Sequence, residues 1–232
     1  MTRSDEKEMM DASNNPRALL EGDLINLRRF NRLLGGYRGI ESVLTELAGQ
    51  ARLKHLSLLD VGTGSADIPE RIVNWCRRRG IDVTIVALDL DPVTINFAAE
   101  RERRYPEIAV VRGDAAKPPF ALKSFDFVLA SQFLHHFSEQ QIVILLRTWS
   151  QLARRAVIVS DLVRHPLAYY GVRLLTRLCT TNIMTRTDAP LSVKRAFTMG
   201  EWRELFRRAA NDRFQLTAVF PFRITAQLEA FS

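Results

Sequence analysis

The stretch LLDVGTGSADIPE, from Leu58 to Glu70, decides the fold. An apolar run ends in Asp60, the glycines Gly62 and Gly64 follow, and a helical pattern takes over at once. A strand that ends in a glycine turn and opens a helix is a common way to hold a nucleotide. The stretch therefore predicts a nucleotide-type site at a strand-to-helix turn.

The third position of the glycine motif argues against a dinucleotide. Dehydrogenases carry G-x-G-x-x-G because the helix N-terminus receives a pyrophosphate. Here the third glycine is replaced by Asp67. A carboxylate at that place repels pyrophosphate, so hydride transfer with a nicotinamide cofactor is disfavoured.

Strand and helix patterns alternate outward from this stretch. Such apolar runs, interleaved with helices, favour a parallel sheet covered on both faces. Two further β-rich runs meet at Pro221 and predict an antiparallel pair. We therefore expect an α/β fold: a Rossmann-like, doubly wound, seven-stranded, mostly parallel sheet with an antiparallel C-terminal strand. The five apolar runs of the parallel part cover residues 56–61, 83–89, 108–112, 125–131 and 156–161.

The chain is expected to form one structural domain. Residues 1–50 are interpreted as an N-terminal tail and helical cover, with the polar residues 1–16 mobile, and residues 51–232 as the catalytic domain. Residues 162–197 interrupt the alternation and predict an inserted amphipathic helix followed by a polar loop. Ser138 with Gln141, and Thr198 with Glu201, are capping-box pairs that mark two helix starts.

Composition excludes several classes of protein. Two cysteines, Cys76 and Cys179, show no ligand spacing, so both are interpreted as buried thiols and no metal is expected. No apolar run reaches the roughly 20 residues of a membrane span, and the first residues lack a signal-peptide pattern, which favours the cytosol. The net charge of +7 is interpreted as arginines on solvated helix ends.

Three acids end three successive strands: Asp60, Asp89 and Asp114. S-adenosylmethionine needs a tight turn but no phosphate pocket. Its ammonium group requires an acidic partner and its ribose diol a carboxylate acceptor. The three acids at one sheet edge therefore favour this cofactor.

At this point the sequence resembles the class I S-adenosylmethionine-dependent methyltransferases. Four motifs occur in the family's order between about Leu56 and Asp161: DVGTGSA, ALDLD, GDAAKPPF and FDFVLASQFLHHF. The last is similar to the ubiquinone and menaquinone-biosynthesis type. The Leu-Lys-Pro-Gly-Gly turn common in that type is replaced here by SQLARRAVIVSD.

The resemblance implies a role for each residue that matches a motif. Around the cofactor, Asp60, Gly62 and Gly64 would hold the methionine part, Asp89 the ribose, and Leu90 the adenine face. Asp114 and Ala115 would contact the adenine amino group, and Ser131 and Gln132 the region under the sulfonium. His136, and next to it His135, are candidates for the base or for orienting the acceptor, because a phenol with a pKa near 10 gains from one. The further acceptor-side candidates are Tyr37, Asp161, Arg164, Tyr169 and Tyr170.

The apolar helices around the site favour a small, largely apolar acceptor, phenolic, quinone-like or polyketide-like, methylated at oxygen rather than carbon. The same faces are also suited to a homodimer. Two alternatives stay open. A nucleic-acid methyltransferase fits the basic charge, although the Asp/Asn-Pro-Pro-aromatic motif is absent after the fourth strand. The second alternative is a protein that binds S-adenosylmethionine without transferring its methyl group.

Overall fold

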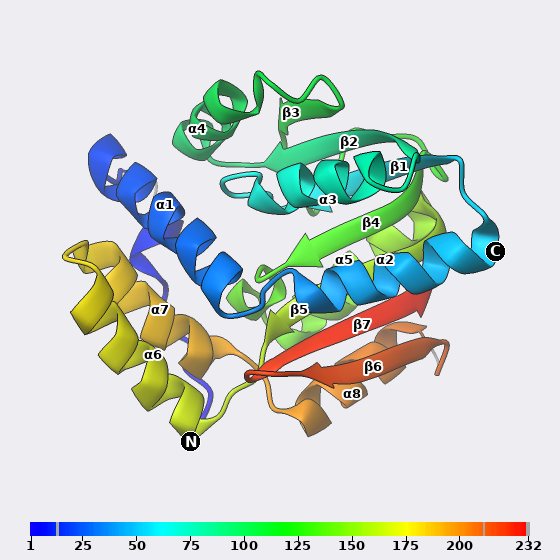
Figure 1. Ribbon diagram of the computed structural model, residues 1–232. Helices are drawn as coiled ribbons and strands as arrows, with labels where there is room; N and C mark the ends of the chain where they lie inside the picture. The colour runs from blue at the N-terminus through cyan, green and yellow to red at the C-terminus, as the bar shows by residue number, and fades with distance from the viewer. Residues whose placement is uncertain (13, 211, 231–232) are drawn as a thin grey trace.

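The computed structural model describes residues 1–12, 14–210 and 212–230, and one seven-stranded sheet runs through it (Figure 1). The strand order is β3-β2-β1-β4-β5-β7-β6. Strands β1 to β5 pair in parallel, and β7 is antiparallel to both β5 and β6. The predicted fold class is confirmed. The strands are β1 (His55–Val61), β2 (Asp82–Asp89), β3 (Ile108–Arg112), β4 (Phe125–Ser131), β5 (Ala153–Leu162), β6 (Phe214–Val219) and β7 (Arg223–Glu229).

Helices cover both faces of the sheet, and each face has its own core. On one face α2 (Arg38–Ala51), α3 (Asp67–Arg77) and α4 (Pro92–Glu102) pack around the buried ring of Trp75. On the other, α5 (Glu139–Leu152) and α8 (Met199–Ala210) pack around Trp149 and Trp202. Full burial of a large apolar side chain is worth about 1.5–3 kcal/mol, so these two layers fix the sheet on which the site is built.

Both predicted capping boxes form. Ser138 Oγ accepts from Gln141 N at 3.4 Å while the Gln141 side chain accepts from Ser138 N at 2.9 Å, which starts α5. Thr198 and Glu201 make the equivalent pair at the start of α8. Side-chain chemistry within four residues is enough to set these two helix ends.

The N-terminal residues differ from the mobile tail that their polar composition predicts. Residues 9–11 form a 3-10 helix, η1 (Met9–Asp11), packed against α7 (Ile183–Arg195). The carboxylate of Asp188 in α7 accepts from the backbone N–H groups of Met9 and Met10, both at 2.9 Å. The side chain of Glu8 is buried. Polar contacts with distant residues hold this segment, and such contacts leave no periodic pattern in the sequence.

Three helices lie at the edge of the sheet where the parallel strands end: α1 (Arg17–Leu33), α6 (Pro166–Cys179) and α7 (Figure 1). Helix α1 follows the predicted apolar stripe and is followed by Gly35 with φ of 70°. Within the insertion, the expected polar loop is instead α7, because Asn182 Oδ1 caps it by accepting from Thr185 N at 3.1 Å and Met184 is buried.

The apolar stripe of α6 faces solvent in the single chain. Its side chains do not join the described apolar core, although their spacing is helical as predicted. Cys179, at the end of α6, is exposed, which corrects its interpretation as a buried thiol, whereas burial raises the pKa of the Cys76 thiol to about 12. Among the described residues, no helix has the length and apolar character needed to cross a membrane. The exposed stripe consists of Leu167, Tyr170, Leu174 and Leu178.

Gly62 and Gly80 have nearly the same backbone angle, φ of 67° and 65°, but different surroundings. A Cβ on Gly62 would lie 2.2 Å from the Phe133 ring, whereas a Cβ on Gly80 would meet nothing within 4 Å. We expect Gly80→Ala to lower the free energy of unfolding by about 1–2 kcal/mol through backbone strain alone. Gly62→Ala should cost clearly more, since the ring must also move. Urea denaturation of both variants measures this, and equal losses would contradict the packing described for Gly62.

Candidate functional site

The turn after β1 ties the first two strand-end acids together. Asp60 Oδ2 accepts from the Thr63 hydroxyl at 2.6 Å, and Asp89 Oδ2, at the end of β2, accepts from Gly64 N at 2.9 Å. Gly62, Gly64 and Ala66 all have positive φ. Only glycine adopts that conformation freely, so the two glycines allow the backbone to turn toward both acids.

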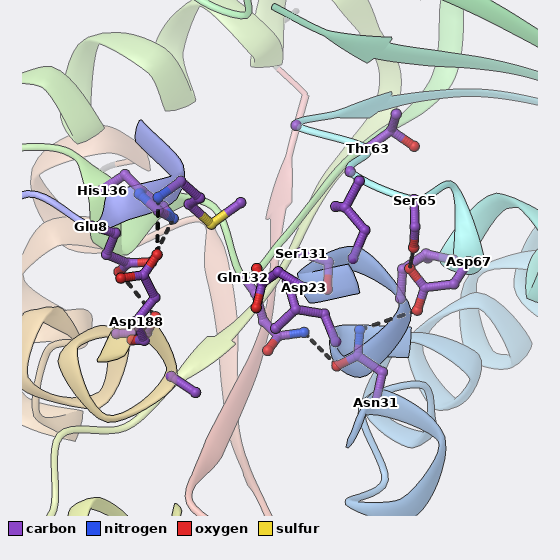
Figure 2. Close-up of a pocket in the computed structure, with 18 of the residues that line it drawn as sticks. Glu8, Asp23, Asn31, Thr63, Ser65, Asp67, Ser131, Gln132, His136 and Asp188 are labelled. Carbon is purple, nitrogen blue, oxygen red and sulfur yellow. Dashed lines mark hydrogen bonds and ion pairs between the residues drawn. The ribbon is translucent and has the colours of Figure 1, made fainter. Parts of the chain in front are cut away.

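A cavity of about 110 Å³ opens at this turn, between the ends of β1 and β4 and the covering segments η1, α1 and α7 (Figure 2). The described residues that line it include no lysine or arginine. Its polar character is therefore acidic, and it is suited to a ligand that carries positive charge. The five acids in its lining are Glu8, Asp23, Asp60, Asp67 and Asp188.

Burial raises the pKa of four of these acids, which are Glu8, Asp23, Asp60 and Asp188. Burial raises the pKa of Asp60 to about 8, and the nearby carboxylates Asp67 and Asp89 act in the same direction. Burial raises the pKa of Asp23 to about 6. Asp23 Oδ2 and Ser131 Oγ are buried without a hydrogen-bond partner. A cationic ligand with polar groups would stabilise the ionised carboxylates, and it would also supply hydrogen-bond partners for the two unpartnered oxygens.

Asn31, on α1, links the cover to the sheet (Figure 2). Its Oδ1 accepts from Gln132 Nε2 at 2.5 Å, and its Nδ2 donates to Asp67 Oδ2 at 3.1 Å. The Tyr37 hydroxyl donates to the same Asp67 oxygen at 2.9 Å, and burial raises the pKa of that phenol. Tyr37 thus braces the turn and is not among the residues that line the cavity.

The predicted cofactor residues fall into two groups. Asp60, Gly62, Gly64, Ser131 and Gln132 line the cavity. The other four lie outside its lining. Asp89 contacts the turn through Gly64, the Leu90 side chain is exposed, Asp114 Oδ1 accepts from Ala116 N at 2.8 Å, and the Ala115 carbonyl accepts from Trp149 Nε1 at 2.8 Å.

His135 lies between two buried acids. Its Nδ1 is 2.7 Å from Asp161 Oδ1, at the end of β5, and its Nε2 is 3.6 Å from Glu8 Oε1. Asp161 also accepts from Leu134 N at 3.0 Å and from Leu162 N at 2.7 Å. Burial raises the pKa of Asp161, but His135 and these N–H groups outweigh it and hold the pKa below its usual value. Asp161 therefore orients the imidazole.

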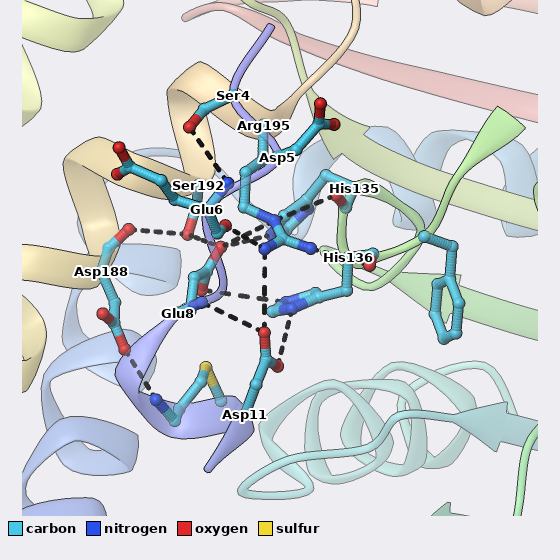
Figure 3. Close-up of polar contacts among 12 residues, drawn as sticks. Ser4, Asp5, Glu6, Glu8, Asp11, His135, His136, Asp188, Ser192 and Arg195 are labelled. Atoms are coloured by element: carbon cyan, nitrogen blue, oxygen red, sulfur yellow. Dashed lines mark hydrogen bonds and ion pairs between the residues drawn. The ribbon is translucent and has the colours of Figure 1, made fainter.

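His136 lies beside His135 and contacts the N-terminal segment (Figure 3). Its Nδ1 is 3.0 Å from Asp11 Oδ1 and its Nε2 is 3.9 Å from Glu8 Oε2. The Ser192 hydroxyl, on α7, donates to Glu8 at 2.9 Å, and burial raises the pKa of Glu8 to about 7. The ligand atoms of Glu8, His135 and His136 all lie within 4.8 Å of one another, which is a spacing that could hold a metal ion.

Three predicted acceptor-side residues are engaged elsewhere. Arg164 donates to both carboxylate oxygens of Glu201, at 2.5 and 2.6 Å. The Lys194 ammonium lies 5.0 Å from the centre of the Tyr169 ring. The Tyr170 side chain is exposed. None of the three lines the cavity.

A second, larger groove of about 610 Å³ lies along α1, α3 and α4. It shares only Asp67 with the acidic cavity among the described lining residues. The chain therefore presents a cation-attracting cavity and a separate surface rich in arginine. The arginines of the groove are Arg28, Arg29, Arg32, Arg71, Arg101 and Arg104.

Comparison with known proteins identifies the segment that carries the turn and the histidines. Residues 58–156 match the family model described as "Methyltransferase domain". This match spans less than half of the chain, and the fold around it is that of the class I S-adenosylmethionine-dependent methyltransferases. The cofactor of this class of domain is S-adenosylmethionine, whose ammonium and sulfonium groups carry positive charge.

The methyltransferase domain is similar to curated and solved proteins of several kinds. It is 29% identical over 110 residues to the non-reducing polyketide synthase Preu3 of Preussia isomera, a match that covers 47% of this chain and 4% of that protein. Human N-acetylserotonin methyltransferase, solved with SAM, shares the fold with a TM-score of 0.65 and 16% identity, over 94% of this chain and 57% of that one. The plantazolicin methyltransferase BamL, solved with SAH and a triazolic desmethylPZN analog, shares the fold with a TM-score of 0.67 and 12% identity, over 92% of this chain and 97% of that one.

Several residues of the site were missed by sequence reasoning. Glu8 and Asp11 lie in a polar segment without periodicity, so nothing local marked them. Asp23 and Asn31 carried a signal, because they lie on or beside the buried stripe of α1 that contains Leu20, Leu24 and Leu27. A polar residue on the buried face of a helix is an informative exception to the apolar pattern.

Asp60 should make stability depend on pH. Its pKa is about 8 in the folded chain against 3.8 for the free side chain. Between these values the unfolded chain has released the proton and the folded chain retains it, so stability falls as the pH rises. Asp60→Asn keeps the shape of the side chain but has no charge. Its free energy of unfolding should therefore rise relative to that of the wild type by up to about 1.4 kcal/mol for each pH unit in this range. Urea unfolding from pH 5 to 8 measures the difference, and parallel profiles would refute the burial cost.

Proposed function

We propose that this chain transfers a methyl group from S-adenosylmethionine to a hydroxyl oxygen of a small, largely apolar acceptor. The observation that carries the proposal is one cavity with two chemically distinct ends. The turn residues Thr63, Ser65 and Asp67 lie on one side of the cavity, next to Asp60, Gly62 and Gly64 in its lining, and His136 lies on the other side (Figure 2). A donor at the first end and an acceptor at the second would face each other across the cavity.

The cofactor end is supported by charge and by the turn. We propose that Asp60, Gly62 and Gly64 hold the methionine part, and that Ser131 and Gln132 lie under the sulfonium. The acids of the cavity suit the ammonium and the sulfonium, and the unpartnered Ser131 Oγ offers a hydrogen bond. Asp89 with Leu90 is proposed for the adenosine ribose and ring, and Asp114 with Ala115 for the adenine amino group.

The transfer itself requires little beyond alignment. A sulfonium already activates its methyl group, so the acceptor oxygen attacks the methyl carbon while the carbon–sulfur bond breaks and its electron pair stays on sulfur. The protein contributes orientation and the exclusion of water. The cover of η1, α1 and α7 over the cavity serves both purposes.

The cavity combines apolar lining residues with the two histidines. An apolar molecule with one hydroxyl would bury its body against the lining and place the hydroxyl at His136 and His135, where its proton is removed. A polyketide synthase among the similar proteins is in keeping with an acceptor of polyketide type. The apolar residues of the lining are Met10, Leu24, Leu27, Ile68, Leu162 and Ala189.

Two tests separate this proposal from the alternatives. Cell extract incubated with the protein and deuteromethyl cofactor should yield a small molecule that gains a labelled methyl group, detected by untargeted mass spectrometry. Cofactor binding without any labelled product would identify a binding protein instead. The arginine-lined groove is the observation that favours a nucleic-acid substrate, and label recovered in RNA or DNA would establish that alternative.

Asp89 and Asp82 stand at opposite ends of β2 and make a matched pair. Asp89→Ala should weaken cofactor binding at least tenfold, because the ribose acceptor and the hydrogen bond to Gly64 N are both lost. Asp82→Ala, at an exposed position at the start of the strand, should bind like the wild type. Calorimetric titration with S-adenosylmethionine measures both, and equal affinities would place the ribose elsewhere.

His136→Ala should separate binding from transfer. We expect cofactor affinity within about twofold of the wild type and a loss of labelled product of at least tenfold, because the acceptor proton is no longer removed. His55→Ala, at the exposed start of β1, is the control. Product formation at the wild-type rate in His136→Ala would exclude this histidine from the reaction.

A further inference from the structure

Glu8, His135 and His136 converge on one point from two separate parts of the chain. Glu8 precedes η1, and the two histidines follow β4 in the 3-10 helix η2 (Leu134–His136). Each Nε2 faces a different oxygen of the Glu8 carboxylate, at 3.6 Å for His135 and 3.9 Å for His136. All three residues line the cavity proposed for methyl transfer. The convergence is therefore part of a site that a small ligand can reach.

The two distances do not suit direct hydrogen bonds. An N–H···O bond measures about 2.7–3.2 Å, so an imidazole that simply donated to Glu8 would lie closer. Two ligands of one ion, each bonded at about 2.1 Å with tetrahedral angles, stand about 3.4 Å apart. The gaps between Glu8 and the two rings are close to the second value. They leave room for an ion between the three side chains.

The carboxylates near Nδ1 of each imidazole also favour a metal ion. Asp161 Oδ1 lies 2.7 Å from Nδ1 of His135, and Asp11 Oδ1 lies 3.0 Å from Nδ1 of His136. A carboxylate on the remote ring nitrogen is the usual support of a metal-binding histidine, because it fixes the ring and leaves Nε2 free to bind. His135 has that support from Asp161, whereas His136 Nδ1 lies at ion-pair distance from Asp11 without a well-aligned hydrogen bond, and the Nε2 atoms of both rings face Glu8.

Charge around the cluster also favours a cation. Besides Glu8, the carboxylates of Asp11, Asp161 and Asp188 surround the two rings. Arg195 Nε is 3.8 Å from Glu8 and its guanidinium 3.9 Å from Asp11, while the Arg3 guanidinium donates to the carbonyl oxygens of His135 and Phe137 and lies 3.6 Å from Asp5. Four carboxylates therefore face the guanidinium groups of Arg3 and Arg195 and, beside Asp161, that of Arg223, so the carboxylates outnumber the guanidinium groups and favour a bound cation.

We propose that Glu8, His135 and His136 bind one divalent transition-metal ion, such as Zn²⁺ or Mn²⁺, with a coordination position open toward the cavity. Two imidazoles and one carboxylate are a ligand set that these ions accept, and three protein ligands leave room for a fourth. No metal was expected from the sequence, because that expectation rested on the cysteines and Glu8 is far from the histidines in the chain.

The ion also specifies the acceptor, and this step rests on the proposed function. An acceptor hydroxyl bound at the open position becomes more acidic, as metal-bound water does. With the ion bound, His135 and His136 act as its ligands in place of the base role proposed above. The hydroxyl releases its proton to water, and the oxygen then attacks the methyl carbon while the carbon–sulfur bond breaks and its electron pair stays on sulfur. The acceptor class that fits is a phenol or an enol whose oxygen can coordinate the ion.

Ion binding is measured directly on the full chain, stripped with a chelator and titrated with Zn²⁺ or Mn²⁺ by calorimetry. We expect one ion per chain and, with Co²⁺, visible absorption bands typical of a low-symmetry site. Glu8→Gln should weaken binding at least tenfold. Glu6→Gln, an exposed glutamate two residues earlier, is the matched control and should bind like the wild type.

Thermal unfolding tests whether Glu8→Gln loses ion binding only because the variant fails to fold. The ion should raise the Tm of the wild type and of Glu6→Gln, but not of Glu8→Gln, because only a folded state with the site intact gains from binding. Absence of stoichiometric binding in the wild type overturns the metal site, and so does equal affinity in Glu8→Gln and the wild type.

The same samples distinguish this inference from the proposed function. Labelled product formed at full rate by metal-free protein overturns the ion and leaves methyl transfer in place. One ion per chain that depends on Glu8, with no labelled product at any ion concentration, supports the metal site and refutes methyl transfer to a small molecule.

Discussion

Carboxyl groups buried at the ends of parallel strands are the constraint on which the rest of the site depends. Asp60 is removed from water at the end of β1, and burial raises its pKa to about 8. The turn offsets part of the cost of burying these carboxylates, because Thr63 donates a hydrogen bond to Asp60 and Gly64 N donates one to Asp89. Asp60 avoids the remaining cost by retaining its proton, and a ligand with positive charge would stabilise the ionised carboxylate instead.

The cover over this cavity is held by polar rather than apolar contacts. Asn31 makes hydrogen bonds to both Gln132 and Asp67, and the Asp188 carboxylate accepts hydrogen bonds from the backbone N–H groups of Met9 and Met10. Hydrogen bonds of this kind fix position and orientation more than they add stability, since each replaces a bond to water. This suits segments that must place Glu8 beside the histidines.

What the sequence could predict follows from the range of the interactions involved. The strands, the glycine turn and the two capping boxes depend on neighbours a few residues apart, and the fold class was predicted correctly from them. The convergence of Glu8 with His135 depends on residues more than a hundred positions apart, and no periodicity marks such a pair. Local spacing also has a limit at Leu167 and Leu174. It predicted an amphipathic helix correctly, but it could not show that the apolar face of this helix is exposed to solvent.

The order of the last two strands has a consequence for how the chain folds. Strand β7 follows β6 in the chain, yet it lies between β5 and β6 and bonds to both. The outer edge of β5 therefore has no partner until residues 223–229 have been synthesised, and an unpaired strand edge is a template for association with other chains. During synthesis the half-made sheet must be protected from aggregation, and a chain cut short before β7 would expose that edge permanently.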